Sequence, residues 1–96
     1  MSYIVKKTTS KPANAQWFSL AYPEVVSSIN SWLATNTGFI SSYKESISST
    51  SLVKIYVFDT EANYRAYLTA ANNNAQEIQR KTYNASNGIT SSQTVV

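Results

Sequence analysis

Residues 52–59 constrain the fold of this chain more than any other segment. They read LVKIYVFD and form its only dense run of β-branched and aromatic residues, the types that favour strands. Side chains of a strand alternate between its two faces, so three β-branched residues share one face while Tyr56 and Phe58 share the other. Both faces are therefore apolar, and we expect other parts of the protein to cover both.

The rest of the chain alternates strand and helix patterns. We expect strands near residues 3–9, 39–47 and 89–96, helices over 23–35 and from Asp59 or Thr60 to about Tyr83, and turns at 48–51 and 84–88. Gly38 is expected in a left-handed conformation after the first helix. The three consecutive asparagines at 72–74 mark a weak point or kink in the second helical region.

This order, β-α-β-β-α-β, predicts a ferredoxin-like α+β domain over residues 1–96. Its four-stranded antiparallel sheet would carry the helices on one face. In that topology the first and third strands are central, and here they are the two most apolar strands, whereas the expected edge strands are polar. A different α+β packing of the same elements remains open.

Size and composition favour an oligomer without a membrane segment. A 96-residue chain forms only a thin core, and much of its 43% apolar content is Ala and Tyr, so a second copy would add stability. The net charge of +3 comes from scattered residues, with Lys6, Lys7 and Lys11 as the densest group, interpreted as a solvated strand end. With no signal peptide and no long apolar segment, we expect a soluble cytoplasmic protein and no membrane partner.

The sheet face remote from the helices is predicted to be a dimer interface. We assign Val53, Ile55 and Val57 to the helix side, because compact β-branched side chains suit packing beneath helices. Alternation then leaves an aromatic patch on the open face, of a size that marks interfaces or ligand sites. The expected interface residues are Tyr3, Tyr43, Tyr56 and Phe58.

A family resemblance follows from the whole-chain order and two junctions. Residues 57–61 (VFDTE) link the third strand to a helix, and Tyr83-Asn84 with Asn87-Gly88-Ile89 precede the last strand. This pattern resembles the dimeric α/β-barrel superfamily, which includes antibiotic-biosynthesis-monooxygenase-like domains. The resemblance implies a homodimer with two sheets packed face to face, often with exchange of the C-terminal strand. The fold does not determine the function.

The residue types exclude several chemistries. With no His and no Cys, the chain lacks the usual neutral-pH base, imidazole or thiolate metal ligands, and histidine-based triads. The haem-degrading branch of the resembled superfamily uses a histidine ligand, so its chemistry does not carry over. Two glycines leave no room for the usual phosphate-binding loops, and the five acids form no metal motif. We therefore expect no cofactor and no metal site.

The leading hypothesis is a non-enzymatic homodimer that binds a small apolar or aromatic ligand between sheet and helices. The pocket candidates are Trp17, Trp32, Tyr43, Tyr64 and Arg65. A cofactor-independent monooxygenase-like enzyme is an alternative, because the resemblance implies that Asn, Trp, Tyr and Arg orient a reactive substrate. A single-strand nucleic-acid binder similar to RNA-recognition motifs is another, with Tyr56 and Phe58 as base-stacking rings; sparse basic residues and the missing glycine pattern count against it.

Overall fold

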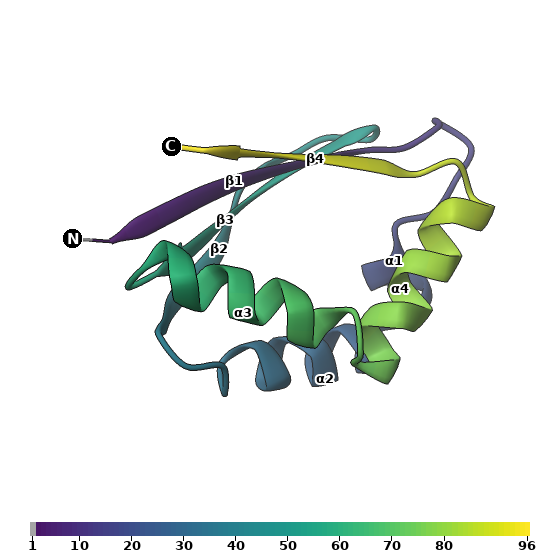
Figure 1. Cartoon of the computed structure of the whole chain (residues 1–96). Helices are drawn as coiled ribbons and strands as arrows, with labels where there is room; N and C mark the ends of the chain where they lie inside the picture. The colour runs from purple at the N-terminus through teal and green to yellow at the C-terminus, as the bar shows by residue number, and fades with distance from the viewer. Residues whose placement is uncertain (1) are drawn as a thin grey trace.

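A β-sheet with helices layered on one side makes up the protein (Figure 1). The computed structural model describes residues 2–96, and Met1 lies outside them. In chain order the elements are β1 (Tyr3–Ser10), α1 (Phe18–Ala21), α2 (Pro23–Leu33), β2 (Phe39–Ile47), β3 (Ser51–Phe58), α3 (Glu61–Ala71), α4 (Ala75–Ser86) and β4 (Thr90–Val95).

The sheet has the predicted ferredoxin-like topology. Its strand order is β2-β3-β1-β4 and all three pairings are antiparallel. The first and third strands are central, as their apolar composition predicts, and the polar strands β2 and β4 form the edges. Figure 1 shows α2 and α3 beneath the sheet, with α4 turned away from them at one end of the molecule, where it rises towards β4.

Side-chain caps set the limits of the second helical region. The Thr60 hydroxyl accepts a hydrogen bond from the backbone N–H of Asn63 at 3.2 Å, which starts α3. The asparagine stretch divides the region in two, because the side chain of Asn74 caps α4 by accepting from the N–H of Glu77 at 3.0 Å. The short helix α1 lies between the first predicted strand and the first predicted helix, where no helix is predicted from the sequence.

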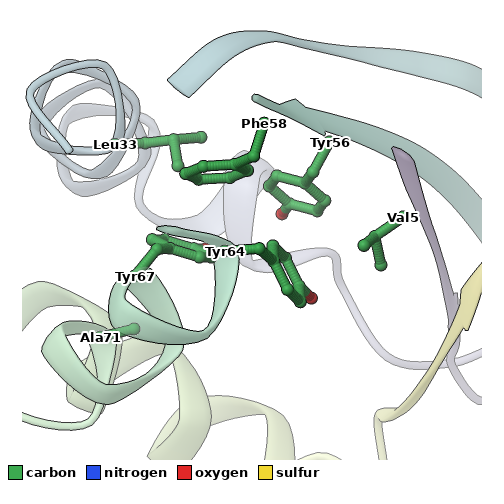
Figure 2. Packing of buried hydrophobic residues seen from close by; sticks show 7 residues of the cluster. All are labelled: Val5, Leu33, Tyr56, Phe58, Tyr64, Tyr67 and Ala71. Carbon is green, nitrogen blue, oxygen red and sulfur yellow. The ribbon is translucent and has the colours of Figure 1, made fainter. Parts of the chain in front are cut away.

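The core is aromatic and lies between β1, β3 and the helices α2 and α3 (Figure 2). Ring centroids of Phe58 lie 5.3 Å from Tyr67 and 5.5 Å from Tyr64, the latter edge-on, a favoured geometry for aromatic pairs. The buried cluster consists of Val5, Leu33, Tyr56, Phe58, Tyr64, Tyr67 and Ala71.

The predicted assignment of the two sheet faces is wrong. Phe58 is 0% exposed and Tyr56 3% exposed, both beneath their own helices, so neither can form a sheet-to-sheet interface. Tyr3 lies on the same side, opposite Phe58, with its ring centroid 5.6 Å from that of Tyr64. The physical reason is the length of the side chains. Aromatic rings from the sheet are long enough to contact the Tyr64 and Tyr67 rings of α3, whereas short β-branched side chains would leave the space between sheet and helix unfilled.

The open face is therefore aliphatic rather than aromatic. Val53, Ile55 and Val57 lie on it, and Ile4 stands directly opposite Val57. Among the predicted interface residues only Tyr43 belongs there, opposite Ile55 and 54% exposed. None of the helices within residues 2–96 is long and apolar enough to cross a membrane.

Candidate ligand site

The helix-facing side of the sheet changes from aromatic to cationic along its strands. Val5 on β1 stands opposite Tyr56 on β3, in the core. The next residues on the same face are Lys7 and Lys54, which also stand directly opposite each other. Lys44 on β2 is in turn opposite Lys54, so three lysines form one row across β2, β3 and β1. We call these three residues the lysine row.

Cavities surround the end of this row beneath α4. Three of them, of about 160, 310 and 290 Å³, all share Lys7 and Arg80 as lining residues. We call this set of three cavities the hollow. The smallest is the most apolar in its lining, because α1 and α2 supply aromatic and aliphatic walls. The lining of this smallest cavity includes Lys7, Trp17, Phe18, Leu52, Lys54 and Arg80.

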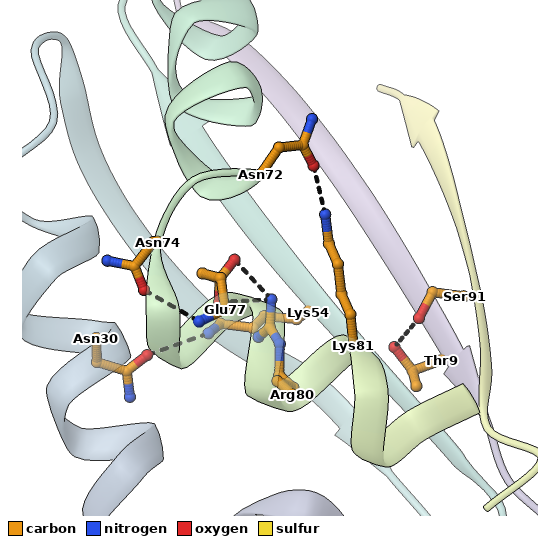
Figure 3. A network of polar contacts seen from close by, with 9 residues as sticks. All are labelled: Thr9, Asn30, Lys54, Asn72, Asn74, Glu77, Arg80, Lys81 and Ser91. Atoms are coloured by element: carbon orange, nitrogen blue, oxygen red, sulfur yellow. Dashed lines mark hydrogen bonds and ion pairs between the residues drawn. The ribbon is translucent and has the colours of Figure 1, made fainter. Parts of the chain in front are cut away.

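One carboxylate, Glu77, is buried against these cations. It is 1% exposed, and its Oε2 accepts a hydrogen bond from Nη2 of Arg80 at 2.9 Å (Figure 3). Its Oε1 lies 2.8 Å from the same Nη2 as an ion pair but has no hydrogen-bond partner of its own. In Figure 3 Lys54 lies beside this pair and donates from Nζ to Oδ1 of Asn30 at 3.4 Å.

Burial and the repulsion of neighbouring cations lower the pKa values of two lysines of the row. Desolvation, followed by the charge of Arg80, lowers the pKa of Lys7 from 10.5 to about 7. The same two causes lower the pKa of Lys54 to about 8. Glu77 acts in the opposite direction in both cases, but a single carboxylate does not balance three cations. The hollow is thus an electropositive place that an anion would stabilise.

Aromatic side chains gather beside the hollow on the side of α1. The Phe18 ring lies 5.3 Å, centroid to centroid, from the rings of both Tyr22 and Tyr83. The Tyr83 hydroxyl donates to the carbonyl oxygen of Gln16 at 2.7 Å, which ties α4 to the segment before α1. Trp17 is 7% exposed and lines the hollow as well.

The five predicted pocket residues do not gather at one site. Trp17 lines the hollow. Trp32 packs on Tyr67 at 5.8 Å, and Tyr64 is buried in the core with its hydroxyl donating to Gln93 at 2.6 Å. Arg65 is exposed on α3 and pairs with Glu61. The remaining candidate, Tyr43, lies on the open face, away from the helices.

Sequence reasoning missed the lysine row. It treated Lys7 as part of a solvated basic cluster, whereas the chain places Lys6 and Lys7 on opposite faces of β1. A signal was present: Lys7 is two residues beyond Val5, and Lys54 has the same parity as Tyr56 and Phe58. Once those rings are assigned to the helix side, alternation places both lysines beneath the helices.

Two solved structures share this fold over nearly the whole chain. One is a mutant of SnoaB, a cofactor-independent oxygenase from Streptomyces nogalater: 14% identity, 99% of this chain and 90% of that chain covered, and a TM-score of 0.70. The other is NE2512, a protein of unknown function from Nitrosomonas europaea: 14% identity, 100% and 90% covered, and a TM-score of 0.62. No family model matches the chain, and no curated protein matches it significantly.

These similarities confirm the predicted likeness to monooxygenase-like proteins of the ferredoxin type at the level of fold. At 14% identity they extend no further, because the same fold supports unrelated functions.

Proposed function

We propose that this protein binds a small, flat, apolar molecule with one negative charge, such as an aromatic carboxylate, and that it does so as a homodimer. The observation that carries the proposal is the hollow, in which Lys7, Lys54 and Arg80 face aromatic and aliphatic walls with one carboxylate among them. Such a site combines an apolar body with a few placed charges, as small-molecule sites do.

The cavity sizes favour a small ligand. Volumes of about 160 to 310 Å³ lie at or below the lower end of the usual range for drug-sized ligands, roughly 300–1,000 Å³. A bicyclic aromatic acid matches this space and the charge. Its rings would lie against Trp17 and Phe18, and its carboxylate would meet Lys54.

The open sheet face supports the dimer part of the proposal. It carries Ile4, Val53 and Val57, which no helix of the same chain covers. A second copy with the same face is a self-complementary partner, as two-fold symmetric interfaces require. The dimer would give the thin sheet an apolar layer on each side.

Calorimetric titration with 2-naphthoate tests the ligand, with neutral 2-naphthalenemethanol for comparison. We expect the acid to bind and the alcohol to bind much more weakly. Lys54→Met should lower the affinity for the acid by about tenfold or more, since a hydrogen bond to a charged group contributes ~1.5–3 kcal/mol. Arg65→Met, which removes an exposed cation outside the hollow, should leave the affinity unchanged. Equal binding of acid and alcohol would contradict the proposal.

Oxygenation is a second candidate function. It is favoured by the aromatic-walled cavity of this chain, whose fold is shared by a cofactor-independent oxygenase. Oxygen uptake with a dihydroxynaphthalene as the electron donor tests it, and Trp17→Ala should abolish the uptake. No uptake above the spontaneous rate would remove this candidate.

We do not propose nucleic-acid binding. That alternative needed the rings of Tyr56 and Phe58 on the open face, and both are buried in the core.

A further inference from the structure

Lys7 and Lys54 are an adjacent pair of half-buried amines. They occupy directly opposite positions on neighbouring antiparallel strands, where Cβ atoms lie roughly 4.5–5.5 Å apart and like charges repel. The guanidinium of Arg80 lines the same cavities. Such a pair is most stable when one of its two amines is neutral.

The surroundings of the two amines differ. The Nζ of Lys54 donates to Asn30 and lies 5.1 Å from the ring centroid of Tyr56, a contact that favours the charged ammonium. The Nζ of Lys7, by contrast, takes part in no ion pair with any of residues 2–96. Hydrogen bonds donated by lysine side chains in this part of the chain come from Lys6, Lys11, Lys54 and Lys81. Lys7 is therefore the amine that is free to react.

The position of Lys7 gives a reactant access to it. It lines all three cavities of the hollow, so empty space adjoins its side chain. Burial and the charge of Arg80 lower its pKa to about 7, which leaves a large neutral fraction at neutral pH. A lysine next to another cation in a desolvated site is a recognised form of activated nucleophile.

We propose that Lys7 forms an imine with the carbonyl carbon of a small aromatic aldehyde or ketone that also carries a carboxylate. This inference rests on the proposed function, because it uses the same hollow and the same anionic, flat ligand. Lys54 and Arg80 would bind the carboxylate, while the carbonyl group would face Lys7.

The chemistry balances without an external reagent. The lone pair of the neutral Lys7 amine attacks the carbonyl carbon, the π pair of the C=O bond moves to oxygen, and a proton passes from nitrogen to that oxygen. The resulting hydroxyl takes a proton from solvent and leaves as water, while the nitrogen lone pair forms the C=N bond. Lys7 is then a protonated imine, and Lys54 stays on the carboxylate.

Reductive trapping with 4-formylbenzoate and cyanoborohydride tests the inference. We expect one aryl-methyl adduct per chain by intact mass, located on Lys7 by peptide mapping. The adduct should be lost in Lys7→Arg, which keeps a cation there, and in Lys7→Met. Circular dichroism of both variants shows whether they fold. Labelling spread over the exposed lysines, or located on Lys54, would overturn the proposal.

The pH profile of labelling gives a second test. The groups that face Lys7 are Arg80, Glu77 and Lys81 on α4 and Lys54 on β3. With these neighbours, the rate should rise through pH 7 and then level off, whereas the rate at an ordinary lysine would continue to rise up to its usual pKa of 10.5. A profile that still rises steeply above pH 9 would contradict an activated amine.

Titration with 4-(hydroxymethyl)benzoate separates this inference from the proposed function. That compound keeps the ring and the carboxylate but has no carbonyl carbon to attack. If it binds and 4-formylbenzoate leaves Lys7 unlabelled, the imine is refuted and the binding site stands. If neither compound binds, both proposals fail.

Discussion

At the scale of single residues, the lysines of the hollow oppose folding at neutral pH. The pKa is about 7 for Lys7 and about 8 for Lys54 in the folded protein, whereas the usual lysine pKa, expected in the unfolded chain, is 10.5. Between these values the unfolded chain binds more protons than the folded one, so the free energy of unfolding should rise with pH. Above about pH 10 the trend should reverse, because burial raises the pKa of Tyr64 to about 12 and the unfolded tyrosine ionises first.

Lys7→Met should therefore stabilise the protein in a pH-dependent way. At pH 6.5 the variant avoids burying an ammonium beside Arg80 and should unfold at a higher urea concentration than the wild type. By pH 9.5 the folded wild type holds a neutral amine, and the advantage should shrink. Urea unfolding at several pH values measures both. Lys6→Met is the control for loss of a lysine from the same strand. A stability advantage of Lys7→Met that grows with pH would contradict the lowered pKa of Lys7.

Glu77→Gln should be strongly destabilising. The side chain is buried in an ion pair with Arg80, and removing one member of a buried pair leaves an uncompensated charge, at a cost of ~3–5 kcal/mol. Glu61→Gln is the matched control, because it breaks a glutamate–arginine pair on the exposed surface of α3. Its effect should be small. Similar urea midpoints for the two variants would show that the buried pair has no special role.

At the scale of elements, the turns around β2 and β4 depend on two glycines with positive φ. Gly38 has φ +81° and Gly88 φ +69°. Alanine at either position should cost ~1–2 kcal/mol for the left-handed backbone. Gly38→Ala should cost more, because its Cβ would overlap the side chains of Asp59 and Asn63, which are hydrogen-bonded to each other at 2.9 Å. At Gly88 the atom nearest to a new Cβ would be Cγ of Pro12, at 3.3 Å. Urea unfolding ranks the two variants, and an equal loss would refute the steric part.

Element order and most boundaries followed from local signals in the sequence. Thr60 caps α3, Asn74 divides the helical region, and residues 48–50 turn the chain between β2 and β3, all through short-range hydrogen bonds. The choice of face for β3 did not follow, because both of its parities are apolar. Packing against the tyrosines of α3 decides that choice, and these lie in a distant segment. The same error hid the lysine row.

At the scale of the whole molecule, the two sides of the sheet have different roles. The helix side is divided between an aromatic core and the charged hollow, so only part of the helical layer contributes apolar packing. The open side carries aliphatic residues at its centre, with the ion pair of Lys6 and Glu45 at 3.4 Å among the side chains there. Association through this side would compensate for the small core of a 96-residue chain.

Val57→Lys should separate the proposed dimer into monomers. Val57 stands opposite Ile4 on the open face, so a second sheet packed there would bury the new ammonium without a partner, which is costly. Ile78→Lys is the matched control, because Ile78 is an aliphatic residue 47% exposed on α4, on the helix side. Light scattering after size exclusion at micromolar concentration should give twice the chain mass of 10.6 kDa for the wild type and the control, and the chain mass for Val57→Lys. A wild type that elutes as a monomer, or a Val57→Lys variant that keeps the dimer mass, would show that the open face is not where two copies meet.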